Sequence, residues 1–181
     1  MSDPKPLLAP LKPVQREAQV WTANGFIVDL WRHPAGDESQ QAGGHFVLPL
    51  AVWRTMQAVN GDVRIGIEVQ PTDCLDSDLD RIAKLSLIAL VFPRFTDGRA
   101  YSIARRMREQ WGYKGELRAR GDVLFDQLPL MLGCGFDSFE IRDAATLDAL
   151  ERGNVPCADH HRRMRRCRPN SAHAAAPVAA E

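Results

Sequence analysis

The fold is decided by the stretch from Phe92 to Ile141, which reads FPRFTDGRAYSIARRMREQWGYKGELRARGDVLFDQLPLMLGCGFDSFEI. An apolar run over residues 85–92 ends at Pro93, a residue that interrupts a strand and forces a turn. Two charged clusters follow, Asp-Gly-Arg at residues 97–99 and Arg-Ala-Arg-Gly-Asp at residues 118–122, each between a strand-like and a helix-like segment. Ligands bind at the carboxyl ends of strands in parallel α/β sheets, so we expect both clusters to face one crevice.

The chain around this stretch repeats the same alternation. Apolar runs predict strands at residues 46–48, 63–69, 87–92, 116–120 and 139–142. Apolar residues at helical spacing predict helices at residues 53–59, 76–85, 101–111, 124–132 and 146–150. Such βα units predict an α/β fold with a mostly parallel sheet. They are too few for a closed eight-stranded barrel, which leaves an open sheet or a partial TIM-like barrel.

The two ends of the chain differ from this central region. Asn24-Gly25 is a turn signal between residues 20–22 and 25–28, and predicts a short N-terminal β-hairpin. Residues 1–19 are proline-rich and predict a flexible arm, and residues 154–181, rich in Arg and Ala, predict a disordered tail. We therefore expect a single α/β domain at residues 20–153.

Composition limits the classes of partner. The chain has 181 residues, and its 23 Lys and Arg balance its 23 Asp and Glu, so no overall field favours nucleic acid or an anionic membrane. No apolar run approaches the roughly 20 residues that span a bilayer, and no signal peptide is recognisable, so we expect a cytoplasmic protein. A partial barrel would expose an apolar edge and favour a homodimer.

Three segments carry a family resemblance: FPRFTDGRAYSIARRMRE, GYKGELRARGDVLFDQL and CGFDSFEI, in this order and spacing. The chain resembles a bacterial family of unknown function whose members are described as oxidoreductases involved in sulfite reduction and are encoded beside assimilatory sulfite reductase. The resemblance covers residues 47–142, with Trp53 in its expected place. It implies a role in sulfite reduction, with sulfite reductase as a partner. Arg120 departs from the pattern, which usually has an apolar residue there.

Arg99 and Arg118 are the candidates for binding a ligand. A guanidinium group presents a planar fork of donors that suits sulfite, sulfate, phosphate or a carboxylate. Arg120 shares a strand face with Arg118 and is a weaker candidate. The alternative is that these arginines form ion pairs at the rim of the sheet with Glu116, Asp122 or Asp126.

Asp97, Asp122 and Asp126 are the candidate catalytic acids or bases. Asp97 and Asp122 follow strands directly, where an Asp equally often caps the next helix. Ser102 lies at the start of a helix whose free N–H groups suit an anion, and Gln127 follows Asp126 on a helix face with Asp122. We expect these two side chains to help bind the ligand.

The sequence names no cofactor. It contains no Cys-x-x-Cys pair and no Gly-x-Gly-x-x-Gly loop, so neither a thioredoxin-like motif nor a dinucleotide fingerprint is present. The spacing of Cys157, His160, His161 and Cys167 does not match a regular zinc finger, and we predict no metal site. Cys134 is a candidate reactive thiol, although a lone cysteine at such a junction is more often a small buried apolar residue.

Three functions remain open. The first is an oxidoreductase or accessory protein of assimilatory sulfite reduction, with an oxyanion site at the strand ends. The second is a partner of sulfite reductase without catalysis of its own. The third is an enzyme that acts on a phosphorylated or carboxylated metabolite.

Overall fold

The computed structural model describes residues 15–33, 44–56, 63–154 and 156. Within these ranges one eight-stranded sheet forms, in the order β2-β1-β8-β7-β6-β5-β4-β3. The strands are β1 (Gln15–Thr22), β2 (Gly25–Ile27), β3 (Trp31–Arg32), β4 (Gly44–Pro49), β5 (Val63–Val69), β6 (Leu87–Phe92), β7 (Glu116–Gly121) and β8 (Ser138–Asp143). The helices are α1 (Leu50–Thr55), α2 (Leu79–Ile82), α3 (Arg99–Glu109), α4 (Leu128–Cys134) and α5 (Ala144–Glu151), with a 3-10 turn, η2 (Phe125–Gln127).

The sheet is mixed, which corrects the expectation of a mostly parallel sheet. Strands β3 to β8 are parallel to one another, whereas β1 is antiparallel to both β2 and β8. The tight turn between Thr22 and Gly25 is the reason, because a two-residue connection joins only antiparallel strands. Strand β1 begins at Gln15, and so includes residues 15–19 of the expected N-terminal arm.

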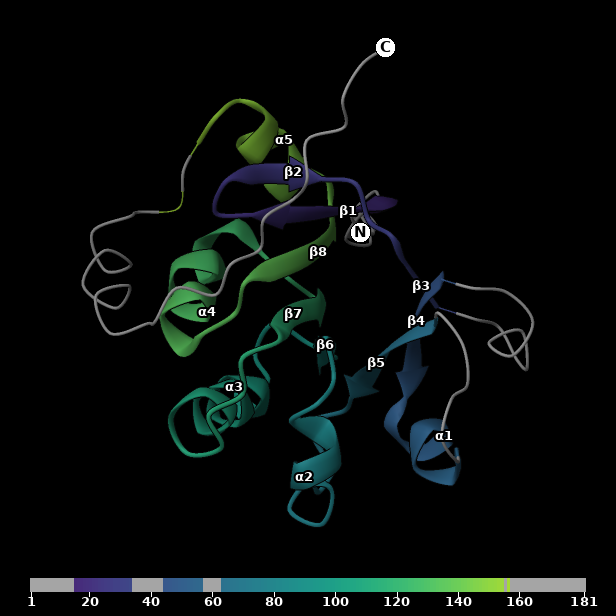
Figure 1. The fold of residues 1–181 in the computed structure, drawn as a ribbon. Helices are drawn as coiled ribbons and strands as arrows, with labels where there is room; N and C mark the ends of the chain where they lie inside the picture. Colours follow the sequence, from purple (N-terminus) through teal and green to yellow (C-terminus); the bar gives the residue numbers. More distant parts are fainter. Residues whose placement is uncertain (1–14, 34–43, 57–62, 155, 157–181) are drawn as a thin grey trace, which may run out of the picture.

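The sheet is open and curls into a half-barrel with helices α1 to α4 along its convex side (Figure 1). Strand β6 lies between β5 and β7 and buries alternate residues against these helices. Its other residues, Leu87 and Ala89, are buried on the inner face beside Val47. Burial on both faces is what the continuous apolar sequence of β6 predicts.

The inner face of the half-barrel is covered by residues 28–33, here called the strap. Its side chains alternate, as in an extended chain. Asp29, Trp31 and His33 contact the inner face: Asp29 bonds Arg118, Trp31 packs on the Val47 cluster and His33 contacts Arg120. Val28 and Leu30 point outward and are 85% and 65% exposed. The strap thus places polar groups from the N-terminal part of the chain against β7 and β8.

The helices differ in extent from those expected. Helix α1 ends at Thr55, and α2 spans only Leu79–Ile82 of the expected residues 76–85. The expected helix at 124–132 is divided into η2 and α4, whose first turn contains Pro129, a residue without a backbone donor. Within the described ranges, none of the helices has the length and apolar character needed to cross a membrane.

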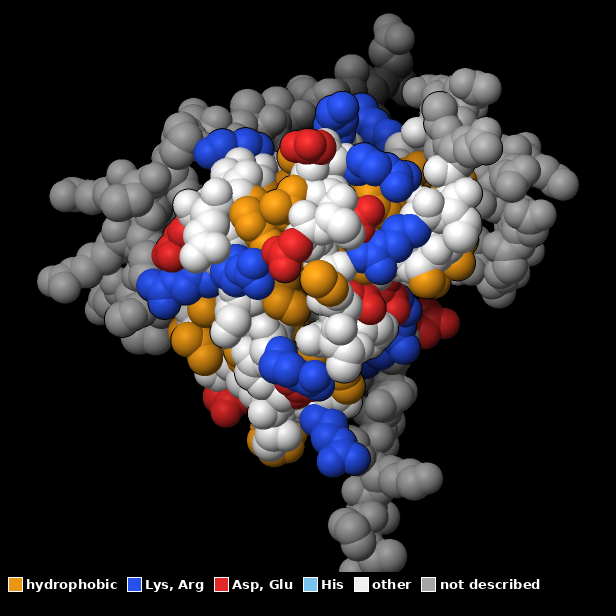
Figure 2. Space-filling view, turned by 90° about the horizontal axis from the view of Figure 1, so that it is seen from below, with side chains coloured by type: hydrophobic (Ala, Val, Ile, Leu, Met, Phe, Trp, Pro, Cys, Tyr) orange, Lys and Arg blue, Asp and Glu red, His pale blue; other side chains and the backbone are white. Residues whose placement is uncertain are grey.

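The helix side of the molecule carries charges of both signs (Figure 2). Lys and Arg side chains are interspersed with Asp and Glu on the face shown. Two pairs of this kind are Arg105 with Glu109 and Arg106 with Asp76, each at 3.0 Å. Exposed pairs of this type contribute little to stability.

Candidate functional site

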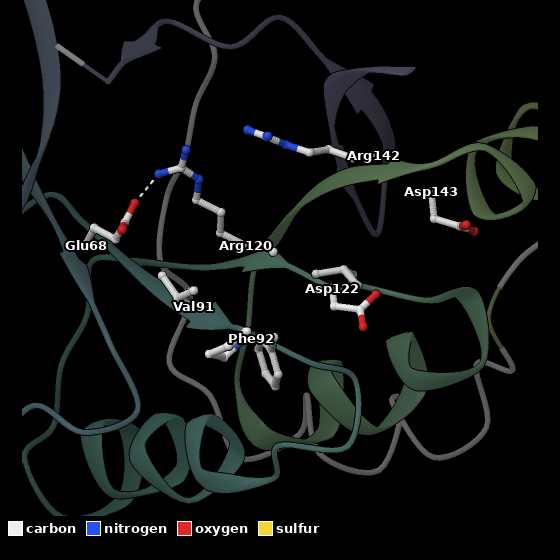
Figure 3. A pocket seen from close by; sticks show the side chains of 10 residues that line it. Glu68, Val91, Phe92, Arg120, Asp122, Arg142 and Asp143 are labelled. Atoms are coloured by element: carbon white, nitrogen blue, oxygen red, sulfur yellow. Dashed lines mark hydrogen bonds and ion pairs between the residues drawn. The ribbon is translucent and has the colours of Figure 1, made fainter. Parts of the chain in front are cut away.

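A cavity of about 560 Å³ opens at the carboxyl ends of β5 to β8 (Figure 3). This is the edge at which ligands bind in parallel α/β sheets. The residues that line it are Glu68, Val91, Phe92, Pro93, Arg120, Gly121, Asp122, Val123, Arg142 and Asp143.

Strand alternation brings the charged residues to this edge. On β7, Leu117 and Ala119 are fully buried against the helices, so Arg118 and Arg120 extend from the opposite, inner face. On β8, Phe139 and Ile141 are likewise buried against the helices, which places Glu140 and Arg142 on the inner face. The two strands therefore present a connected row of charged side chains.

Glu140 links the two arginines of the cavity. Its Oε1 accepts a hydrogen bond from Arg120 Nε at 3.3 Å, and bonds from Arg142 Nε at 3.2 Å and Nη2 at 2.7 Å. The Glu140 side chain is only 5% exposed, whereas that of Arg142 is 44% exposed. Arg120 also donates from Nη1 to Glu68 Oε2. One buried carboxylate thus holds guanidinium groups from neighbouring strands side by side.

The second oxygen of Glu140 has no hydrogen-bond partner among the described residues. Glu140 Oε2 lies 3.2 Å from Arg120 Nε, within ion-pair distance but without hydrogen-bond alignment, and 3.7 Å from His33 Nε2. A buried acceptor without a donor is costly, so this oxygen is a position where a proton or a donor would stabilise the site.

His33 completes the network from the strap. Its Nδ1 lies 2.8 Å from Arg120 Nη1, and because the arginine can only donate, this nitrogen acts as the acceptor. The imidazole is therefore neutral, with its proton on Nε2 and facing Glu140. Burial, and after it Arg120, lowers the pKa of His33 below its ordinary value.

The two aspartates of the cavity are held by backbone donors. Asp122 Oδ2 accepts from the Phe95 N–H at 2.8 Å, and Asp143 Oδ2 accepts from the Thr146 N–H at 2.7 Å as the cap of α5. Figure 3 shows both carboxylates directed away from the guanidinium groups of Arg120 and Arg142. These aspartates fix the loops around the cavity.

Gly121 allows the end of β7 to approach β6. Its φ of +101° lies in the region that glycine favours, and a Cβ there would lie 2.3 Å from the Phe92 carbonyl oxygen. The next residue, Asp122, donates its N–H to the same carbonyl at 2.8 Å. Close packing of the backbone therefore requires a glycine between Arg120 and Asp122.

The structure does not bring Arg99 and Arg118 together. Arg118 is 1% exposed and bonds Asp29, Glu116 and Ser138 on the inner face. Arg99 is 57% exposed and its Nε and Nη2 bond Asp97 at 2.9 and 2.7 Å. These bonds hold the pKa of Asp97 at about 2. The two expected clusters thus separate, and of their residues Arg120, Gly121 and Asp122 are among the described residues that line the cavity.

Of the other predicted residues, Gln127 contacts the loop that follows β6. Gln127 Nε2 donates to the Phe95 carbonyl at 2.8 Å, whereas Ser102 and Asp126 are exposed. Gln127 Oε1 and the Tyr101 hydroxyl are buried without a partner among the described residues. Burial raises the pKa of Tyr101 to about 12. These groups are not among those that line the cavity.

The cysteines give no further site among the described residues. Burial raises the pKa of the half-buried Cys134 thiol, which keeps it in the less reactive, protonated form. The residues Cys157, His160, His161 and Cys167 lie outside the described part of the chain. In that described part, no three His, Cys, Asp or Glu residues come together as metal ligands.

Four residues of the network were not singled out from the sequence: His33, Glu68, Glu140 and Arg142. Alternation along SFEIR, residues 138–142, carried a usable signal, because it places Glu140 and Arg142 on the same face as Ser138. Glu68 and His33 reach Arg120 across 52 and 87 residues of chain, and no local pattern indicates contacts of that range.

The fold and the cavity define an α/β half-barrel protein with a polar candidate site at the carboxyl edge of its sheet. The family described as bacterial protein of unknown function (DUF934) matches residues 66–172, and the chain belongs to this family. No curated protein and no solved structure matches the chain. The matched segment includes the C-terminal part of β5, with Glu68, and all of β6 to β8, and therefore every residue that lines the cavity.

Proposed function

We propose that this protein binds a small oxyanion between Arg120 and Arg142, and that it serves assimilatory sulfite reduction. The observation that carries the proposal is the pair of guanidinium groups held beside the cavity by one buried carboxylate, Glu140. Paired guanidinium groups bind two-oxygen anions through charge-assisted hydrogen bonds.

Donors remain available for such a ligand. A guanidinium group has five N–H donors, and Arg120 Nη2 and Arg142 Nη1 have no partner among the described residues. An oxyanion would also compete with Glu68, whose carboxylate is 19% exposed, for Arg120 Nη1. Binding therefore exchanges the partly buried carboxylate of Glu68 for a ligand and leaves Glu140 in place.

The link to sulfite comes from the family resemblance. Sulfite is a small oxyanion, and the described side chains supply hydrogen bonds and charge, which are what binding and delivery require. The role proposed is that of a cytoplasmic accessory protein with sulfite reductase as its partner. Asp122 and Asp143 would hold the cavity loops without contacting the ligand. Copurification with sulfite reductase would support this role, whereas a yellow purified protein would favour flavin chemistry and an oxidoreductase instead.

Calorimetric titration tests the binding site. Sulfite, sulfate, phosphate and acetate are titrated into the wild type, Arg120→Gln, Arg142→Gln and the double variant. Loss of one charge-assisted partner, about 1.5 to 3 kcal/mol, should weaken sulfite and sulfate binding roughly 10- to 100-fold. The double variant should lose less than the sum of the two, because one ligand is shared.

Arg105→Gln is the matched control, because Arg105 is an exposed arginine of α3 that pairs only with Glu109 among the described residues. Its affinity should equal that of the wild type. A wild type that binds none of the four anions, or a control that loses as much as Arg120→Gln, contradicts the proposal. Tight binding of phosphate or acetate with none of sulfite points to a phosphorylated or carboxylated metabolite.

A further inference from the structure

His33 contacts the proposed oxyanion site without lining it. The imidazole bonds Arg120 of β7, and lies 3.9 Å from Glu68 of β5 and 3.7 Å from Glu140 of β8. Arg118 of β7 also acts on it through its charge. Arg142 of β8 reaches it indirectly, through the carboxylate of Glu140 that both contact.

The charges of this network leave no surplus for an anion. It contains three guanidinium groups, those of Arg118, Arg120 and Arg142, and four carboxylates, those of Asp29, Glu68, Glu116 and Glu140. With His33 neutral, the network is already slightly negative. A doubly charged ligand would move it further from neutrality, in a partly buried place where charge is poorly screened.

Resting on the proposed function, we infer that the cavity takes a doubly charged oxyanion together with one proton, and that His33 receives this proton. When the ligand occupies Arg120, the hydrogen bond from Arg120 Nη1 to His33 Nδ1 is given up. Nδ1 is then free to take a proton from solvent. The imidazolium ion pairs with Glu68, which has lost its arginine, and with the unpartnered Glu140 Oε2.

The geometry supports this exchange of partners. Nδ1 faces Glu68 and Nε2 faces Glu140, so both N–H groups of an imidazolium would have a carboxylate within 4 Å without movement of the ring. The lowered pKa of His33 in the free protein means that the proton is absent before the ligand arrives. Anion binding should raise it, because the cation Arg120 turns to the ligand.

Calorimetry with sulfate tests the inference on the full chain. Sulfate keeps both charges near neutral pH, so any proton taken up comes from solvent and binds to the protein. Titrations in two buffers with different ionisation enthalpies give the number of protons bound, and His33→Gln and His45→Gln are measured beside the wild type. His45, whose ring contacts Trp31, controls for loss of any inner-face imidazole.

We expect uptake on the order of one proton in the wild type and in His45→Gln at a pH just above the lowered pKa of His33, and none in His33→Gln. Wild-type affinity should rise by up to about tenfold per pH unit as the pH falls, and that of His33→Gln should stay level.

Equal proton uptake in wild type and His33→Gln overturns the inference while the oxyanion site stands. Absence of sulfate binding in the wild type also overturns the inference, whereas the proposed function falls only when sulfite, phosphate and acetate fail to bind as well. If His33→Gln fails to fold, an NMR titration of the wild-type imidazole decides: sulfate must raise the pKa of His33.

Discussion

Arg118 and Asp29 form an ion pair of 2.8 Å across 89 residues of sequence, and it attaches the strap to the middle of the inner face. Arg118 is buried and also bonds Glu116, so its charge is balanced from two sides. The strap is also held by the pairing of β3 with β4 and by the contact of His33 with Arg120. The ion pair therefore joins the strap to β7, the strand that also carries Arg120 of the cavity.

The first prediction concerns this pair. Asp29→Asn should lower the free energy of unfolding by about 1 to 3 kcal/mol, because Arg118 would keep Glu116 but lose its second carboxylate. Urea denaturation measures the loss. Asp80→Asn, a change of the same kind on an exposed residue of α2, should leave the free energy within about 0.5 kcal/mol. Equal values for both variants would mean that the strap is not held by Asp29.

Much of the fold could be predicted from local pattern. The continuous apolar run at residues 87–92 predicts a strand buried on both faces, and β6 has those bounds. The turn signal Asn24-Gly25 predicts the hairpin that β1 and β2 form. The pairing of β1 with β8 could not be predicted, because it depends on contacts between the two ends of the domain and leaves no period in the sequence. This pairing joins the antiparallel hairpin to the parallel strands.

The second prediction tests the burial of β6. Ile88 is fully buried in a strand with neighbours on both sides, so Ile88→Asp should abolish soluble expression. An unpaired buried carboxylate costs several kcal/mol, against a total stability of roughly 5 to 15 kcal/mol. Val52→Asp, at an exposed apolar residue of α1, should express as the wild type does. Normal yield and melting of Ile88→Asp would place this strand outside the core.

The sequence indicates an edge of the sheet for a candidate site, whereas it does not indicate which residues line the cavity there. Parallel strands with charged ends indicate a site at the carboxyl edge, and the cavity is there. The family pattern favours Arg118 over Arg120 as a ligand-binding residue. In the structure Arg118 is buried, and Arg120 lines the cavity. Both arginines lie on one face of β7, and they differ in their distance from the carboxyl end of the strand. Whether a residue at a given distance reaches the cavity depends on where the neighbouring strands end. A single sequence contains no measure of it.

The third prediction concerns the C-terminal tail, which lies outside the described residues apart from the buried Pro156. We propose that residues 157–181 are dispensable for folding, since their composition of arginine, alanine and proline cannot bury a core. A chain ending at Pro156 should keep its melting temperature within about 2 to 4 °C of the wild type, the shift that roughly 1 kcal/mol produces in a domain of this size.

A chain ending at Gly153 is the comparison, because it also lacks the buried Pro156 and should melt lower. The family match extends to residue 172, so sulfite binding is measured on both truncated chains. A large loss of stability at Pro156 would mean that the tail docks on the domain. Zinc binding by Cys157, His160, His161 and Cys167 would then be tested first.

The last prediction is the pH dependence of stability. The folded pKa of His33 lies below the ordinary value of about 6.5 that the unfolded chain has, because the imidazole is partly buried and lies beside Arg120. The unfolded chain therefore binds more protons in this range, and His33 stabilises the fold above pH 6.5 but loses that contribution as the pH falls toward the folded pKa. Urea unfolding at pH values of about 7.5, 6.5 and 5.5 should show wild-type stability falling relative to His33→Gln, by at most about 1.4 kcal/mol per pH unit for one proton.

Asp97, with a pKa of about 2, titrates well below this window. The difference between the two curves gives the contribution of the His33 side chain, and parallel curves would show that His33 is equally protonated in the folded and unfolded chains.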